Sequence, residues 1–282
     1  MPLETLGESN IKGMTLEGPP PKKDFIFNPE KDISEAEWIE IKESLRKKIE
    51  DGDDLETDNT MEMFERSVLL ASHRKIQKSD ELWKWLQEIK RREKRFFEKT
   101  LEQDPVPDTL ISILNIERIC APSSFAKNEI PVGLAKSVSD SLLRMNLSSY
   151  YLNRLFKFSS ALPGVTAPFL NDKLWEHIMN TAPTKEWEDH IEYYAFARVL
   201  FPEKYALLPP IKKEAVRYMK ERLQLFRQAK NWDAFLAVAV PLCLISATKV
   251  GFEKEGFVMD FTPVEKKHTA PGTEHPPEKL NF

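Results

Sequence analysis

The chain has 282 residues, 41% of them hydrophobic, which is enough to bury a large core. Its 41 basic and 45 acidic residues leave a formal net charge of −4, which excludes a global positive field that would recruit nucleic acid or acidic lipid. The two cysteines, Cys120 and Cys243, lie in separate apolar runs. This usage is typical of small core residues in a reducing compartment, so we expect a cytoplasmic protein.

Both ends of the chain have the composition of solvated tails. Residues 1–30 hold three glycines and five prolines among scattered charges, and residues 262–282 hold four prolines and few large apolar side chains. Such segments cannot bury enough apolar surface to fold, which predicts disorder at both ends. The first 25 residues also lack the apolar stretch of a secretory signal. Order is expected to begin at Ile33, because Ser34 and Glu37 have the spacing of a capping box.

Apolar residues at helical spacing follow along most of the chain, and almost no segment before residue 248 alternates with period two. A first helix is predicted from Ser34 to Ile49, a second opens at Met61, and a third follows a capping Ser79. Later helices are expected at 108–119, 132–145, 149–160, 172–180, 185–201, 211–230 and 232–247. The pattern predicts an all-α fold, an array of about ten helices.

The last of these segments, Trp232–Ala247, is the one that the rest of the chain is expected to cover. Ala234 to Ile245 are twelve consecutive apolar positions in a chain that is 30% charged. A helix that is apolar on all sides has no face for water and belongs inside a packed array or a membrane. Twelve positions are too few to span a bilayer core, which takes about 20 residues. The segment is therefore predicted to be a buried central helix.

The loop LPGVTAPFLN at 162–171 is the best internal boundary. It separates a predicted N-terminal helical region, 31–161, from a C-terminal region, 172–261. The second region closes with two β-prone runs, Lys249–Phe252 and Phe257–Phe261, around a glycine-containing connection, which predicts a short C-terminal β-hairpin. Because a two-stranded ribbon is marginal alone, its apolar side chains are expected to pack on the last helices.

Tryptophan spacing indicates an internal repeat. Trp38 and Trp83 are 45 residues apart, and so are Trp187 and Trp232. Helical hairpins of the HEAT and armadillo kind repeat every 40–47 residues, roughly. A stacked array of such hairpins is the predicted architecture, and a single irregular helical bundle is the alternative.

The last third of the chain carries a further pattern. It consists of Leu200-Phe201-Pro202, Trp232-x-x-Phe235-x-x-x-Ala239 and a Lys249-Val250 hairpin with Gly256. Between residues 186 and 261, about a quarter of the chain, this pattern resembles the C-terminal part of uncharacterised bacterial helical-repeat (HEAT-like) proteins. The resemblance implies a helical-repeat fold and a bacterial source, and it implies no activity and no site. Pro241 departs from it, because a helix rarely holds a proline in its middle.

The acidic loop after the first helix invites a calcium interpretation. Asp51, Asp53 and Glu62 fall at positions 1, 3 and 12 of an EF-hand loop. Leu55 stands at position 5, where an oxygen ligand is needed, and Glu56 at position 6, where glycine makes the sharp turn. The loop fails at both positions and is predicted to be a solvated linker.

Other motifs for chemistry are missing from the sequence. The Glu-x-x-His pair Glu265 and His268 lies in the predicted C-terminal tail. His190 has Glu186 and Tyr194 four residues away on either side, a spacing that favours a surface hydrogen bond over a metal site. No zinc-protease, serine-elbow or phosphate-loop motif is found. The sequence therefore predicts no enzyme, no metal and no cofactor.

The densest basic run is the one feature suited to phosphate. It comprises Lys90, Arg91, Arg92, Lys94 and Arg95. Glutamates at 88, 93 and 98 neutralise neighbours three or four residues away, which favours a solvated helix face. Contact with RNA or an acidic partner is the alternative interpretation.

We predict a non-catalytic helical-repeat scaffold that holds a protein partner and has no membrane span. An RNA- or ribosome-associated factor that uses the basic run is the alternative. An open face with exposed aromatic side chains would favour the scaffold. A positive stripe that joins the basic run to Lys212, Lys213 and Arg217 would favour RNA, and a deep pocket with converging buried carboxylates would favour an enzyme.

Overall fold

The computed structural model describes residues 26–51, 59–71, 80–92, 108–120, 132–253 and 256–261. Within them the chain forms twelve α-helices, three short 3₁₀ turns and one β-hairpin. The helices are α1 (Pro29–Asp32), α2 (Glu35–Glu50), α3 (Asn59–Ala71), α4 (Glu81–Arg92), α6 (Asp108–Cys120), α8 (Val132–Arg144), α9 (Ser149–Ala161), α10 (Pro163–Thr166), α11 (Asp172–Thr181), α12 (Trp187–Leu200), α13 (Lys213–Gln228) and α14 (Trp232–Ser246). The strands are β1 (Lys249–Glu253) and β2 (Gly256–Asp260). The prediction of an all-α fold with a short C-terminal hairpin is confirmed.

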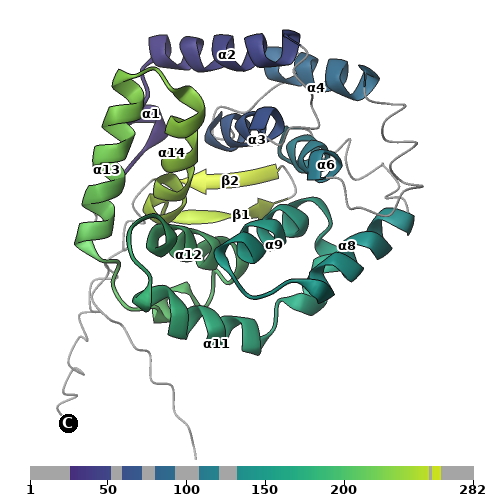
Figure 1. Ribbon diagram of the computed structural model, residues 1–282, viewed down its shortest axis with the longest axis vertical. Helices are drawn as coiled ribbons and strands as arrows, with labels where there is room; N and C mark the ends of the chain where they lie inside the picture. Colours follow the sequence, from purple (N-terminus) through teal and green to yellow (C-terminus); the bar gives the residue numbers. More distant parts are fainter. Residues whose placement is uncertain are drawn as a thin grey trace, which may run out of the picture.

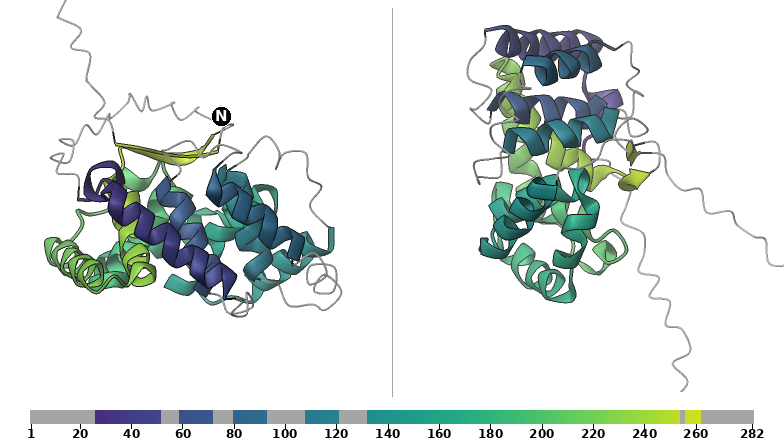
Figure 2. Two further views of the ribbon diagram at one scale, coloured as in Figure 1. Left: turned by 90° about the horizontal axis from the view of Figure 1, so that it is seen from above. Right: turned by 90° about the vertical axis from the view of Figure 1, so that its right-hand side faces the viewer.

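The helices stack in layers, and α14 reaches the middle of the molecule (Figure 1). Figure 2 shows α2 and α4 together at one end, with α3 and α6 in the next layer. α11 lies at the opposite end (Figure 1). α14 packs against α3, α12 and α13, so it contacts helices from both predicted regions. The hairpin covers one side of the helical array (Figure 2).

α14 is the buried central helix that the sequence predicts. Five of its side chains have no exposed surface: Phe235, Leu236, Ala239, Leu242 and Cys243. Each large apolar side chain taken out of water contributes about 1.5–3 kcal/mol, so this helix is a main source of stability. No helix in the described part of the chain is long and apolar enough to cross a membrane.

Two helix starts show how local sequence sets the boundaries. Before α2 the capping box is present: the Ser34 hydroxyl accepts from the Glu37 N–H at 3.2 Å, and the Glu37 carboxylate accepts from the Ser34 N–H at 2.8 Å. At α4 Asp80 Oδ1 accepts from the Leu82 N–H at 2.9 Å, and aspartate is one of the preferred capping residues. The predicted capping residue, Ser79, lies outside the described residues.

The tryptophans that suggest a repeat do not occupy equivalent positions. Trp38 is the fourth residue of α2, whereas Trp83 is the third residue of α4. Trp187 and Trp232 both begin helices, but Trp187 is exposed and Trp232 is buried. Equal spacing therefore does not translate into equal environments, and the HEAT-like repeat stays a prediction.

The predicted start of order at Ile33 is wrong. Phe27 is buried, and its N–H donates to the Ser246 Oγ at 3.0 Å. Asn28 caps α1, which begins at the buried Pro29. The predicted tail 1–30 therefore extends five residues too far, because a single buried phenylalanine anchors a segment whose composition is that of a tail. Residues 1–25 and 262–282 lie outside the described residues.

The predicted loop at 162–171 is helical over most of its length. Pro163 begins α10, and Pro168 lies at the start of a 3₁₀ turn, Ala167–Phe169. Proline has a φ that suits the first turn of a helix, and it loses no hydrogen bond there. The same prolines that indicate a loop in the sequence therefore start two helical turns.

The hairpin packs against helices from both predicted regions. Its strands pair antiparallel, and Val250, Phe257, Met259 and Phe261 are buried. β1 packs against α12, as predicted, but β2 packs against α6, which is not one of the last helices. The regions 31–161 and 172–261 also share one continuous cluster of buried side chains. The division of the chain into two regions at 162–171 stays a prediction from the sequence.

Candidate functional site

Two members of the basic run, Lys90 and Arg91, have side chains within the described residues, and both form ion pairs. Lys90 Nζ lies 2.9 and 3.0 Å from the carboxylate oxygens of Glu117, whose side chain is only 5% exposed. Arg91 pairs with Glu88, one turn earlier, at 2.8 Å. Phosphate would have to compete with these carboxylates. The other members of the run lie outside the described residues: the Arg92 side chain, Lys94 and Arg95.

The described residues form no continuous positive stripe between α4 and α13. α13 runs along one side of the molecule, and α4 lies at the far end of α2 (Figure 1). Lys212 Nζ donates to the Lys185 carbonyl at 2.7 Å. Lys213 is exposed at the start of α13, but Arg217 lies 3.9 Å from Glu221. The arrangement that would favour RNA is therefore not met in the described part of the chain.

A partly buried charged seam lies where α3 meets α2, α9 and α14. It comprises Lys48, Glu62, Glu65, Arg66, Lys157 and Asp233. Asp233 pairs with Lys48 at 3.2 Å and with Arg66 at 3.6 Å. Arg66 pairs with Glu62 at 3.1 Å, and Glu62 pairs with Lys157 at 2.8 Å. The sequence does not reveal this seam, because its partners are up to 185 residues apart.

Glu65 is the most deeply buried member of the charged seam. Its carboxyl group accepts hydrogen bonds from the Ser112 hydroxyl at 3.2 Å and from the Asn115 amide, and Lys157 Nζ lies 3.9 Å away. Burial raises the pKa of Glu65 in spite of these partners. Burial acts in the same direction on Glu62, but the charge and hydrogen bond of Lys157 lower the pKa of Glu62 below its usual value. One turn of α3 thus holds two carboxyl groups with opposite tendencies.

Glu192 on α12 is a further carboxyl group near the seam. Burial, together with the charges of Asp189 and Glu188, raises the pKa of Glu192 to about 7, and Arg66 opposes this rise. With Glu192 the seam has four carboxyl groups against three cations. A shifted carboxyl group of this kind is a candidate for acid–base catalysis only where it lines a cleft.

Within the described residues the charged seam forms no metal site of three or more His, Cys, Asp or Glu side chains. A surface hollow in the described part of the chain lies elsewhere, on α13. Each of the six seam members lies 3.9 Å or less from an oppositely charged member, so the seam joins α3 to α2, α9 and α14. Glu62, the last position of the rejected calcium loop, is used in this way.

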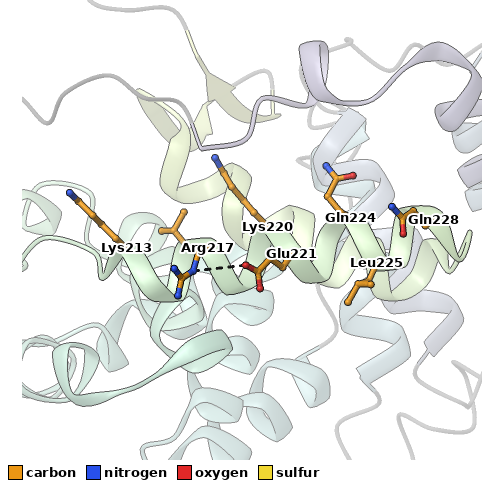
Figure 3. Close-up of a pocket in the computed structure, with 8 residues that line it drawn as sticks. Lys213, Arg217, Lys220, Glu221, Gln224, Leu225 and Gln228 are labelled. Atoms are coloured by element: carbon orange, nitrogen blue, oxygen red, sulfur yellow. Dashed lines mark ion pairs between the residues drawn. The ribbon is translucent and has the colours of Figure 1, made fainter.

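A surface hollow of about 620 Å³ lies against the outer face of α13 (Figure 3). Its described lining residues all come from that helix: Lys213, Val216, Arg217, Lys220, Glu221, Gln224, Leu225 and Gln228. Lys213, Lys220 and Gln224 point to one side of the helix axis and Leu225 to the other (Figure 3). One helix supplies only one wall, so the described residues do not enclose a small molecule here.

An aromatic edge lies between α12 and this face of α13. It comprises Trp187, Tyr218, Arg222, Leu225 and Phe226. The last four share one side of α13, because Arg222, Leu225 and Phe226 follow Tyr218 by four, seven and eight residues. Trp187 begins α12 with a positive φ of 53°, and its ring centroid lies 4.8 Å from that of Tyr218. Arg222 places its guanidinium 5.8 Å from the Tyr218 ring and 4.8 Å from the Phe226 ring. Trp187 remains 49% exposed and Leu225 60% exposed.

His190 supports the aromatic edge from the interior. It is fully buried, its Nδ1 donates to the Ala182 carbonyl at 2.9 Å, and its Nε2 accepts from the Lys212 N–H at 3.0 Å. The second bond needs the Nε2 lone pair, so the ring is neutral, and burial lowers the pKa of His190. The predicted surface hydrogen bond is therefore wrong. His190 instead ties the first turn of α12 to the residue before α13, which holds Trp187 against Tyr218.

Comparisons with known proteins assign no family to these surfaces. The resemblance of the C-terminal third to bacterial helical-repeat proteins therefore stays a prediction from the sequence. No protein-family model, no curated protein and no solved structure matches the chain.

Proposed function

We propose that the protein is a non-catalytic helical-repeat scaffold that binds a protein partner through the aromatic edge. The observation that carries the proposal is the state of Trp187. Its side chain is half exposed, and its backbone has a left-handed conformation. For a residue other than glycine such a conformation costs about 1–3 kcal/mol, and it collects at functional sites where the surrounding fold maintains it. An exposed tryptophan held in this way fits a residue that a partner covers.

The composition of the aromatic edge supports the same proposal. Tryptophan, tyrosine and arginine are the residues that most often dominate binding energy at protein interfaces. Trp187, Tyr218 and Arg222 supply one of each, already in contact with one another or with a common neighbour. Because His190 fixes the helices beneath, little side-chain ordering remains to be done when a partner binds.

The proposal also includes a HEAT-like architecture and a cytoplasmic location. Layers of α2 with α4 and of α3 with α6 support stacked helical hairpins of the HEAT-like kind (Figure 2). The two cysteines are free thiols, Cys120 partly buried and Cys243 buried, which supports a reducing compartment such as the cytoplasm. The bacterial source rests only on the resemblance of the C-terminal third.

Affinity capture from the native host tests the proposed function. The parent chain is compared with Trp187→Ala and with a matched control, Tyr150→Ala, which removes a 60% exposed aromatic side chain from α9. Loss of an interface hot spot costs about 2 kcal/mol, which is roughly a 30-fold loss of affinity. We expect partner recovery to fall with Trp187→Ala and to stay unchanged with Tyr150→Ala, while both variants melt like the parent.

The same experiment separates the RNA alternative. Recovery should resist nuclease treatment, and it should also survive the exchange of four basic-run residues for glutamine: Arg91, Arg92, Lys94 and Arg95. If nuclease or the glutamine exchange removes the partner and Trp187→Ala does not, the protein is an RNA-associated factor. Full recovery with every variant would place the partner surface outside the aromatic edge.

A further inference from the structure

His190 joins two helices through both nitrogens of one buried imidazole ring. The side chain has no exposed surface. Its Nδ1 donates to the Ala182 carbonyl at 2.9 Å, and its Nε2 accepts from the Lys212 N–H at 3.0 Å. An imidazole nitrogen accepts a hydrogen bond only while it carries no proton. Protonation of His190 therefore sets two N–H groups against each other and breaks the bond between α12 and the residue before α13.

The nearest groups oppose the charged form of His190. Burial is the main cause that lowers the pKa of His190 below 6.5; the hydrogen bond to the Ala182 carbonyl acts the other way, and the positive charge of Lys212 lowers the pKa further. The Tyr194 ring also packs against the imidazole, with 4.7 Å between the centroids. His190 is therefore neutral at neutral pH and takes up a proton only as the pH falls below 6.5.

Other charged or titratable groups come from the elements around the first turn of α12. They are Lys185, Glu186 and Asp189 at the start of α12, His177 on α11, Tyr205 before α13, and Arg222 on α13. The charged side chains of α9 and α14 pair with other helices: Arg154 with Asp108, Lys157 with Glu62, and Asp233 with Lys48. Lys212 Nζ donates to the Lys185 carbonyl at 2.7 Å, which keeps its charge at the start of α12. The residue that binds the ring thus also opposes its protonation.

The bond that His190 accepts maintains the aromatic edge. Trp187 lies one turn before His190, has a φ of 53°, and places its ring centroid 4.8 Å from that of Tyr218. A left-handed residue other than glycine persists only where the surrounding fold maintains it. A second contact across the edge, between Arg222 and Glu188, is 39% and 45% exposed, and exposed ion pairs add little stability. When the histidine bond breaks, the first turn of α12 therefore relaxes away from α13.

We infer that protonation of His190 is a switch that opens the aromatic edge in acid, so that the partner is released as the pH falls below neutrality. The release of the partner rests on the proposed function, whereas the opening of the edge does not. Because the partner binds the closed edge, its affinity follows the neutral fraction of His190. Below the midpoint of the His190 titration, affinity should fall about tenfold for each pH unit.

Nitrogen-15 NMR of the full chain follows the switch directly. The indole N–H signals of the six tryptophans are recorded from about pH 7.5 to about pH 5, and Trp187→Phe identifies the Trp187 signal. His190 Nε2 is followed in the same samples and is assigned through its contact with the Lys212 N–H. We expect the Trp187 signal to move with the same midpoint as His190 Nε2, while the signal of the buried Trp232 stays in place.

Two matched variants separate His190 from other titrating groups. His190→Gln keeps an oxygen that can accept from the Lys212 N–H and cannot become charged, so the Trp187 signal should stay in place. His177→Gln removes a partly buried histidine from α11 and should leave the movement of the Trp187 signal unchanged. The midpoints in the parent decide the question even where His190→Gln does not fold.

Three results would overturn the inference. They are a Trp187 signal that stays in place while His190 takes up its proton, a movement that persists in His190→Gln or disappears in His177→Gln, and a His190 that stays neutral until all six tryptophan signals move together. The last result is acid unfolding of the whole chain.

Capture at two pH values judges the release of the partner separately. Partner recovery by the parent should fall between about pH 7.5 and about pH 5.5, and recovery by His190→Gln should not. Equal recovery by the parent at both values would show that the partner is not released. If Trp187→Ala loses the partner but the Trp187 signal ignores pH, the scaffold function stands and the switch is wrong. If the signal follows His190 but capture is unchanged by Trp187→Ala, the switch stands and the proposed function is wrong.

Discussion

Glu62 and Glu65 lie one turn apart on α3, and their exchange for glutamine separates two kinds of buried carboxyl group. Glu62 is 2.8 Å from Lys157 and 3.1 Å from Arg66, and its side chain is 26% exposed. Breaking a fully buried ion pair costs about 3–5 kcal/mol, and breaking an exposed pair costs less than about 1 kcal/mol. Partial exposure puts Glu62→Gln between these limits, at about 2 kcal/mol of unfolding free energy.

Glu65→Gln is expected to cost less than about 1 kcal/mol at about pH 5, although Glu65 is the more deeply buried of the two. Burial raises the pKa of Glu65 and so favours its neutral form, and glutamine is neutral and of nearly the same size. Its amide oxygen accepts from the Asn115 amide, and its amide nitrogen donates to the Ser112 hydroxyl in place of the bond that Glu65 accepts. Urea denaturation of the parent and the two variants measures both losses under the same conditions.

The dependence on pH has an opposite sign for the two residues. The pKa of Glu65 is raised in the fold, so its contribution is present below the unfolded value of 4.5 and is lost as the pH rises through the folded pKa. Glu65→Gln should therefore gain on the parent as the pH rises. The pKa of Glu62 is lowered, so its contribution is present above 4.5 and disappears as the pH falls. A larger loss for Glu65→Gln than for Glu62→Gln at about pH 5 would refute this account.

Four further changes test other parts of the fold. Glu192→Gln should match the parent near pH 4.5 and exceed its stability by about 2–3 kcal/mol at about pH 8, because the folded pKa of about 7 makes ionisation unfavourable in the parent; urea titrations across this range measure the difference. Leu244→Asp places an unpaired charge in the core and should cost several kcal/mol, and a thermal melt within a degree or two of the parent, roughly, would contradict the core assignment of α14. Lys230 has a φ of 52° just after α13, so Lys230→Gly should raise the unfolding free energy by about 1 kcal/mol in urea denaturation. Ending the chain before Val250 should lower the melting temperature, because the buried hairpin side chains are lost, whereas ending it after Thr262 should leave the temperature unchanged.

Helix positions follow from the sequence wherever local rules decide them. The predicted helices at 149–160 and 172–180 are observed at Ser149–Ala161 and Asp172–Thr181. Ser148 and Asn171 cap them with their side chains, as the preferred residues at these positions do. Periodicity and capping both act within a few residues, so a single sequence contains the information that they need.

The charged seam could not be predicted in this way, because helical periodicity shows which face is buried and not which helix covers it. Glu65 does carry one signal: it follows Met61 by four residues and precedes Val68 by three, so it lies on the apolar stripe of α3. A carboxyl group on such a stripe must find a partner or take up a proton. Nothing in the local sequence identifies Lys157, which is 92 residues away, as that partner.

The exposure of Trp187 in the aromatic edge could be predicted from the sequence only in part. Its neighbours are Glu186, Glu188 and Asp189, and three charged neighbours in one turn already indicate a surface tryptophan. The 45-residue spacing to Trp232 favours the opposite interpretation, a structural position repeated along the chain. The conflict is resolved by tertiary contacts, because His190 fixes the first turn of α12 against the start of α13 and leaves the indole ring outside. The proposed binding surface therefore depends on His190, a residue that the sequence assigned to the surface and that the structure places in the interior.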